Sequence, residues 1–157
     1  MIPQLFVDSS VHAQSKSGIG AYLFISDLNT TITLLTKQIK TKQFVSSSST
    51  ILELETLIWA IDELSPWNKK FVIYTDSQNI VRLPERRERL EKQNYFTRSG
   101  KRLKNYILYQ RFFSLSDKTN FEIIKVKGHK PNSHKDNIDK IFSLVDNAAR
   151  KALRELK

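Results

Sequence analysis

The chain has 157 residues, no cysteine and a formal net charge of +10. This length suits one domain spanning residues 1–157, and the absence of cysteine excludes disulfide frameworks, zinc–thiolate sites and thiol nucleophiles. No stretch approaches the roughly 18 apolar residues of a membrane span, and no export signal is recognisable at the start. We therefore expect a cytoplasmic, monomeric protein that does not enter membranes, and the basic charge favours a polyanionic partner such as nucleic acid.

The first third of the chain predicts three strands and a helix. Apolar and β-branched runs indicate strands at 4–8, 18–25 and 31–39, which would form an antiparallel meander. Apolar residues then recur at helical spacing from Ile51 onward, until Pro66 ends the segment.

The remainder predicts two further strands, each followed by a helix. Strands are expected at 71–74 and 121–126, and amphipathic helices at 103–112 and 138–153. A polar loop should precede the last helix. The order predicts an α/β fold with a five-stranded mixed sheet, three antiparallel strands followed by two parallel ones, flanked by helices.

Two aspartates follow apolar strands, where a carboxylate is costly unless it is paired, hydrogen-bonded or bound to a cation. Asp8 comes directly after the first strand, and its alternative role is an Asx-turn or a helix cap. Asp76 follows the strand at 71–74, at the kind of sheet edge where ligands bind, and its alternative role is to cap the next helix.

Two further carboxylates lie within predicted helices, and each has a rival. Glu53 could instead form a capping box with Thr50, and Glu55 lies on the other flank of the same apolar stripe. Asp146 lies mid-helix, where aspartate is unfavourable, but Asp139 is two turns earlier on nearly the same stripe. Spacing alone does not choose between Asp139 and Asp146.

Positive charge is concentrated in residues 82–106, which we call the basic segment. It contains nine Lys or Arg and three Glu, so its net charge is +6. Either it is a solvated helix face with internal ion pairs, or it binds a polyanion.

Taken together, five short phrases resemble type 1 ribonuclease H, and they occur in that family's order along almost the whole chain. They are Phe6-Val7-Asp8-Ser9-Ser10, Glu53-Leu54 with Ala60 seven residues later, Tyr74-Thr75-Asp76-Ser77-Gln78, Val126-Lys127-Gly128-His129, and Val145-Asp146-Asn147-Ala148-Ala149-Arg150. The resemblance favours Glu53 over Glu55 and Asp146 over Asp139. The chain departs from the family pattern at Ser9, where glycine is usual, and in a longer stretch between His129 and Asp146.

The resemblance implies an endonuclease that cuts the RNA strand of RNA/DNA hybrids and leaves 5′-phosphate and 3′-hydroxyl ends. Two Mg²⁺ ions, or Mn²⁺ in their place, would lie about 3.5–4 Å apart and clamp the attacking water and the leaving oxygen. Asp8 would bridge them, Glu53 and Asp76 would bind one, Asp146 would bind the other, and His129 would assist proton transfer or product departure.

The resemblance also implies where the substrate binds. The basic segment corresponds to a substrate-gripping protrusion, and Ser49 stands where an asparagine that helps to read the RNA often occurs. The candidate substrate-binding residues are Ser10, Ser49, Gln78, Arg86, Arg87, Arg89, Tyr95, Phe96, Lys101 and Arg102. The alternatives are another nuclease of the same fold, such as a junction resolvase or a transposase-type enzyme, and a catalytically silent hybrid-binding module.

Overall fold

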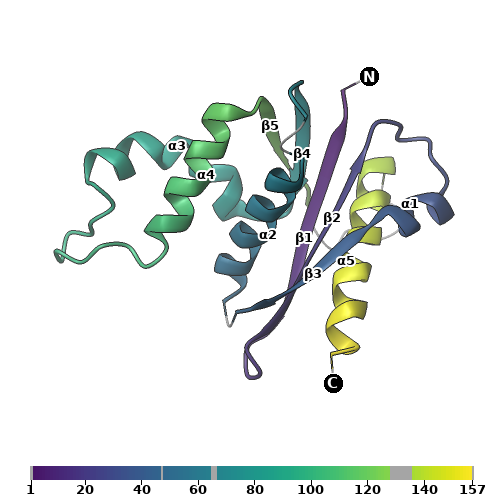
Figure 1. Cartoon of the computed structure of the whole chain (residues 1–157), viewed down its shortest axis with the longest axis horizontal. Helices are drawn as coiled ribbons and strands as arrows, with labels where there is room; N and C mark the ends of the chain where they lie inside the picture. The colour runs from purple at the N-terminus through teal and green to yellow at the C-terminus, as the bar shows by residue number, and fades with distance from the viewer. Residues whose placement is uncertain (1, 47, 65–66, 128–135, 157) are drawn as a thin grey trace.

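The computed structural model describes residues 2–46, 48–64, 67–127 and 136–156, and its centre is a five-stranded sheet in the order β3-β2-β1-β4-β5 (Figure 1). The antiparallel strands are β1 (Gln4–His12), β2 (Ser17–Ile25) and β3 (Lys40–Val45). The parallel pairings join β1 to β4 (Phe71–Thr75) and β4 to β5 (Phe121–Lys125). The predicted mixed sheet is therefore confirmed.

Helices cover both faces of this sheet (Figure 1). Helix α2 (Ser49–Glu63) packs on one face, while α5 (Asn137–Arg154) and the short α1 (Ile32–Gln38) lie on the other. Helices α3 (Gln78–Lys92) and α4 (Tyr106–Lys118) stand beside the α2 face, and the basic segment runs through α3 and the loop that joins it to α4.

Strand β1 is buried on both sides, which explains its unbroken apolar start. Leu5 and Val7 belong to the core cluster beneath α2 and α4, whereas Phe6 belongs to the cluster beneath α5. Successive side chains of a strand point to opposite faces, so a central strand needs apolar residues in succession. Asp8 lies two residues after Phe6, so its side chain points to the same face of the sheet, the one covered by α5.

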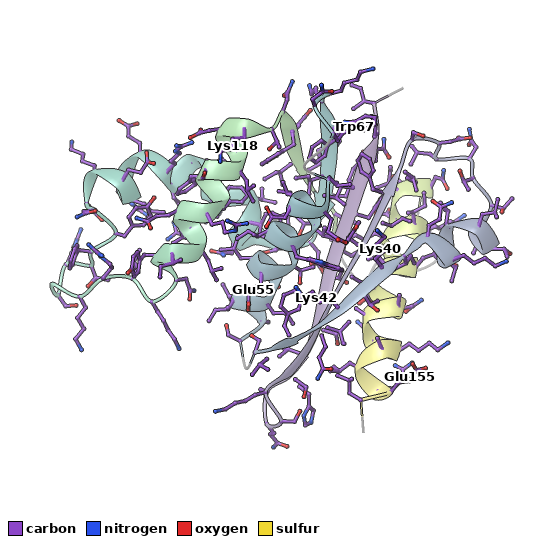
Figure 2. All side chains as sticks on the ribbon, viewed as in Figure 1. Lys40, Lys42, Glu55, Trp67, Lys118 and Glu155 are labelled. Carbon is purple, nitrogen blue, oxygen red and sulfur yellow. The ribbon has the colours of Figure 1, made fainter. Side chains whose placement is uncertain are left out.

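The predicted strand at 31–39 is wrong, because this segment forms α1 and the third strand comes next. Thr31 caps α1, its hydroxyl accepting a hydrogen bond from the Leu34 backbone N–H, and Leu35 is the buried residue of the helix. Strand β3 was missed because it is a polar edge strand. Lys40 and Lys42 project from it, in a region where Glu55 of α2 also lies (Figure 2), and charged edge residues discourage pairing with other chains.

Two glycines of β2 allow α2 to lie close to the sheet. A Cβ atom at Gly18 would lie 2.7 Å from Leu52 Cδ2, and one at Gly20 would overlap the Thr56 hydroxyl. Glu53 is the neighbour of Leu52 in α2. This close approach therefore sets the height of the Glu53 backbone above the sheet.

Candidate active site

Asp8 and Asp76 occupy matching positions on two parallel strands. The pairing of β1 with β4 ends at Phe6 and Tyr74, and each aspartate lies two residues beyond that pair. Because the strands are parallel, both carboxylates emerge at the same edge. Strand β1 itself continues to His12 and pairs Asp8 with Ala21 of β2, so the predicted end of the strand at residue 8 and the Asx-turn or cap alternative are both wrong.

Ser77, rather than Asp76, caps α3. The Ser77 hydroxyl accepts a hydrogen bond from the Ile80 backbone N–H at 3.2 Å, and the Ser77 backbone N–H donates to Thr75 Oγ1 at 3.1 Å. The capping alternative for Asp76 is therefore wrong, and Asp76 contributes to the lining of a pocket.

Glu53 lies in the first turns of α2, where it reaches across to the start of α3. The cap of α2 is Ser48, whose hydroxyl accepts from the Ile51 backbone N–H, so the predicted Thr50 capping box does not form. Instead, Glu53 Oε2 accepts a 2.7 Å hydrogen bond from the Ser77 hydroxyl. Glu55, its rival, does not line the pocket and has Lys42 as its charged neighbour.

The two aspartates of α5 have different surroundings, although both line the pocket. Asp139 forms a capping box with Asp136, in which each backbone N–H donates to the other's carboxylate, and this box starts the helix. Asp146 accepts a 3.1 Å hydrogen bond from Arg150 Nε, and its carboxyl lies close enough to Asp8 to help raise the pKa of Asp8. Spacing left these two open, whereas the contact with Asp8 favours Asp146.

The four predicted carboxylates therefore meet at one pocket of about 300 Å³. Its lining consists of Asp8, Ser9, Ser10, Val11, Glu53, Asp76, Val126, Lys127, Asp139, Phe142, Ser143, Asp146 and Arg150. They come from β1, α2, the residue after β4, the segment after β5, and α5, so the fold brings together groups that are far apart in the sequence.

The like charges of the pocket act on each other. Burial is the largest cause that raises the pKa of Asp8, and together with the neighbouring Asp76 and Asp146 carboxyls it brings that pKa to about 9. Burial also raises the pKa of Glu53, opposed by the hydrogen bond from Ser77 and assisted by Asp76. A bound cation offsets the electrostatic repulsion among clustered carboxylates of this kind and favours their ionised forms.

The donor set suits a hard divalent cation that keeps most of its water. All four side chains offer oxygen, which Mg²⁺ prefers. Across residues 2–46, 48–64, 67–127 and 136–156, no three Asp, Glu, His or Cys side chains form a ready-made cage for a metal ion. In phosphoryl-transfer sites, Mg²⁺ typically takes one or two carboxylates and completes its shell with water and phosphate oxygens.

Of the other predicted residues, Ser10 belongs to the pocket, Ser49 and Gln78 do not line it, and one cannot be placed. Ser49 is the exposed first residue of α2, and Gln78 opens α3, where its Oε1 accepts a 2.6 Å hydrogen bond from Lys125. His129 lies outside the described residues.

Sequence reasoning gave no role in the site to Lys127 and Arg150, which line the pocket, or to Ser77, which follows the lining residue Asp76. Lys127 and Arg150 are part of the phrases quoted above, and Arg150 lies one helical turn after Asp146, a spacing that predicts a pair. Ser77 directly follows Asp76, and its contact with Glu53 joins residues 24 positions apart, which no local pattern reveals.

The basic segment divides into residues with internal contacts and residues without them. Arg87 donates two hydrogen bonds to Asp117 of α4, at 2.6 and 2.8 Å, and a third to Glu91. Arg86 donates to Asn79 and lies over the Tyr109 ring. These two arginines, predicted to bind substrate, thus help to hold α3 against α4.

The loop of the basic segment presents one of its two predicted aromatics. Phe96 is 38% exposed, and the Arg102 guanidinium lies 4.7 Å from the ring centres of both Phe96 and Tyr106. Tyr95 is only 5% exposed and packs in the core, so the structure argues against its predicted contact with a nucleic acid strand. Arg89 and Lys101 are exposed.

Comparison with known proteins identifies the family that carries this arrangement. The family described as RNase H matches residues 3–154. The chain belongs to the RNase H family. Ribonuclease H of Clostridium botulinum (strain Hall) is 29% identical over 107 residues, which cover 67% of this chain and 70% of that protein.

Solved structures agree on the RNase H fold. The solution structure of the PFV RNase H domain aligns with a TM-score of 0.72 and 12% identity, covering 98% of this chain and 93% of that one. LC11-RNase H1, solved in complex with an RNA/DNA hybrid, aligns with a TM-score of 0.60 and 14% identity, covering 96% and 99%. In the described part of the chain, no helix has the length and apolar character needed to cross a membrane.

Proposed function

We propose that the protein is a metal-dependent endonuclease that hydrolyses the RNA strand of RNA/DNA hybrids and leaves 5′-phosphate and 3′-hydroxyl ends. Membership of the RNase H family supports a nuclease. The observation that carries the proposal is the convergence of Asp8, Glu53, Asp76 and Asp146 on one pocket.

We assign the pocket carboxylates to the binding of two divalent cations, Mg²⁺ or Mn²⁺. Bound there, such ions would activate the attacking water and stabilise the leaving 3′-oxygen. Asp8 interacts with both Asp76 and Asp146, a position that suits a ligand shared by two ions. Glu53 and Asp76 would serve one ion and Asp146 the other, while His129 would assist proton transfer.

Substrate binding would rest on the phosphate backbone, as the charge distribution suggests. Lys127 and Arg150 line the pocket, and several cations of the basic segment, such as Arg89 and Lys101, are exposed. Contacts of this kind position a duplex without reading bases, and they weaken as salt rises. We further propose that the chain acts as a single domain and as a monomer in the cytoplasm.

One assay separates this function from its rivals. The protein is incubated with Mg²⁺ and matched labelled substrates: an RNA/DNA hybrid, double-stranded RNA, double-stranded DNA and a four-way junction. We expect selective loss of the RNA strand of the hybrid, abolished by EDTA and restored by Mg²⁺. Cutting of the junction instead would indicate a resolvase, and hybrid binding without cleavage would indicate a silent binding module.

A further inference from the structure

Ser77 forms hydrogen bonds with three elements, through its hydroxyl with α2 and α3 and through its backbone N–H with β4. Ser77 is 4% exposed and follows Asp76 directly. Its oxygen accepts the Ile80 N–H of α3, and it donates its proton to Glu53 Oε2 of α2 at 2.7 Å. Its backbone N–H is held by Thr75 at the end of β4.

The chemistry of a hydroxyl fixes the direction of these bonds. A serine has one proton to donate and two lone pairs that accept. The Ile80 backbone N–H can only donate, so it takes a lone pair of the oxygen. The single proton of Ser77 is therefore available to Glu53, whose carboxylate can only accept once it is ionised.

Glu53 depends on this contact for its orientation. Glutamate has several rotatable bonds and is costly to fix. Within the described part of the chain, the bond from Ser77 is its only hydrogen bond. Removal of this donor would leave the Glu53 carboxylate free to change rotamer, although the α2 backbone would stay in place.

We propose that Ser77 is a positioning residue of the site: its hydroxyl orients Glu53 so that the carboxylate is ready to bind a divalent cation. The proposal deepens the proposed function and rests on it for the cation. Partners that orient a metal ligand from outside the coordination shell commonly affect metal affinity by about 10- to 100-fold.

The test must separate the bond to Glu53 from the cap of α3, because Ser77 serves both. Ser77→Gly removes the hydroxyl, but glycine is itself a favourable N-cap residue. Ser77→Thr keeps both the hydroxyl and the cap. Thr31→Gly, at the cap of the remote α1, controls for a cap change away from the pocket.

Mg²⁺ and Mn²⁺ binding to each full-length variant is measured by calorimetry, beside thermal unfolding in EDTA and hybrid cleavage. For Ser77→Gly we expect metal affinity to fall by about 10-fold or more, with the metal-free unfolding temperature close to that of Thr31→Gly. At limiting metal, kcat should fall while the KM for hybrid stays within about twofold, because the substrate contacts are intact. Ser77→Thr should restore both affinity and kcat.

Unchanged metal affinity in Ser77→Gly would overturn the proposal, as would an equal loss in the Gly and Thr variants. Failure of the wild-type protein to cleave any hybrid would overturn the proposed function instead. The calorimetric comparison still tests Ser77 in that case, because it needs no substrate.

Discussion

The carboxylate pocket and the basic segment differ in how sequence and fold place their charged side chains. The acids of the pocket come from separate parts of the chain, on β1, after β4, and on α2 and α5, and the fold brings them together at one pocket. The cations of the basic segment are neighbours in the sequence, and the fold separates them, with Arg86 and Arg87 bound between helices and Arg89 and Lys101 in solvent. A short stretch of sequence therefore reveals the basic charge, whereas the acidic site is assembled from residues that are far apart in the sequence.

The two regions also differ in their electrostatic interactions: like charges repel each other in the pocket, whereas opposite charges attract each other in the basic segment. Repulsion among the pocket acids and their burial favour the neutral form of Asp8, a state that a bound cation would reverse. In the basic segment, the hydrogen bonds of Arg87 lower the pKa of Asp117, since the guanidinium favours the carboxylate. We expect substitutions in the pocket to cost activity, and substitutions in the basic segment to cost binding or stability depending on the residue.

The largest effect should follow Asp8→Asn, which removes a carboxylate that interacts with Asp76 and Asp146. We expect hybrid cleavage to fall by more than about 100-fold, beyond the usual cost of losing a residue that only supports a metal ligand. Hybrid binding, measured by fluorescence anisotropy, should persist because the basic segment is unchanged. Cleavage at the wild-type rate would remove Asp8 from the catalytic assignment.

The next effect should come from the exposed cations of the basic segment. Arg89, Arg98, Lys101 and Lys104 make no ion pair with any described residue, and all four are exposed. Changing all four to Gln should weaken hybrid binding by roughly tenfold or more at low salt. The slope of log affinity against log salt should become shallower by about 0.9 for each phosphate that the variant no longer neutralises.

The matched control removes the same charge from other elements. Its four exposed lysines lie outside the basic segment: Lys37, Lys69, Lys118 and Lys151. If the basic segment grips the duplex, this control should retain most of the binding affinity and of the salt slope. Equal losses in the two quadruple variants would show that net charge alone attracts the substrate.

A smaller effect concerns the stability of the metal-free protein. Because the folded-state pKa of Asp8, about 9, lies above the ordinary value of 3.8, the unfolded chain ionises first as pH rises. The contribution of Asp8 to the free energy of unfolding should therefore fall steadily between those two values and level off above the higher one. Urea unfolding in EDTA should show this slope, and Asp8→Asn should flatten it. An identical pH dependence in both proteins would refute the raised pKa.

Local sequence predicted the mixed sheet and the positions of Asp8 and Asp76 beyond two of its strands, because those signals are local. The apolar run before Asp8 and the motif around Asp76 each fit within a few residues, and both lie where the resemblance implied. The sequence failed at α1 and β3, where the Thr- and Ile-rich segment formed a helix and the lysine-bearing segment formed the edge strand. Exposed elements carry little hydrophobic pattern, so their identity depends on tertiary packing.

Contacts between distant residues were beyond the sequence. The capping-box pattern at Thr50 and Glu53 was overridden because Ser48 caps α2 two positions before Thr50, too early for Glu53 to reach back. Glu53 instead meets Ser77, and that pairing depends on how closely α2 lies on Gly18 and Gly20. Likewise, the charges in the sequence do not reveal that Arg87 of α3 is hydrogen-bonded to Asp117 of α4.

The smallest effect should follow Arg87→Ala, which tests whether this arginine is structural. Its guanidinium binds Asp117 through two hydrogen bonds and lies 5.1 Å from the centre of the Phe113 ring, yet the side chain is 33% exposed. Partly exposed ion pairs and cation–π contacts are each worth up to about 1 kcal/mol, so we expect a loss of roughly 1 kcal/mol in the free energy of unfolding. Arg89→Ala removes the same charge two residues away without those contacts, and should leave stability nearly unchanged while weakening hybrid binding. The reverse result would be that Arg87→Ala weakens binding more than Arg89→Ala and leaves stability intact. It would mean that Arg87 leaves Asp117 to contact the nucleic acid. The division of the basic segment into bound and exposed cations would then be wrong.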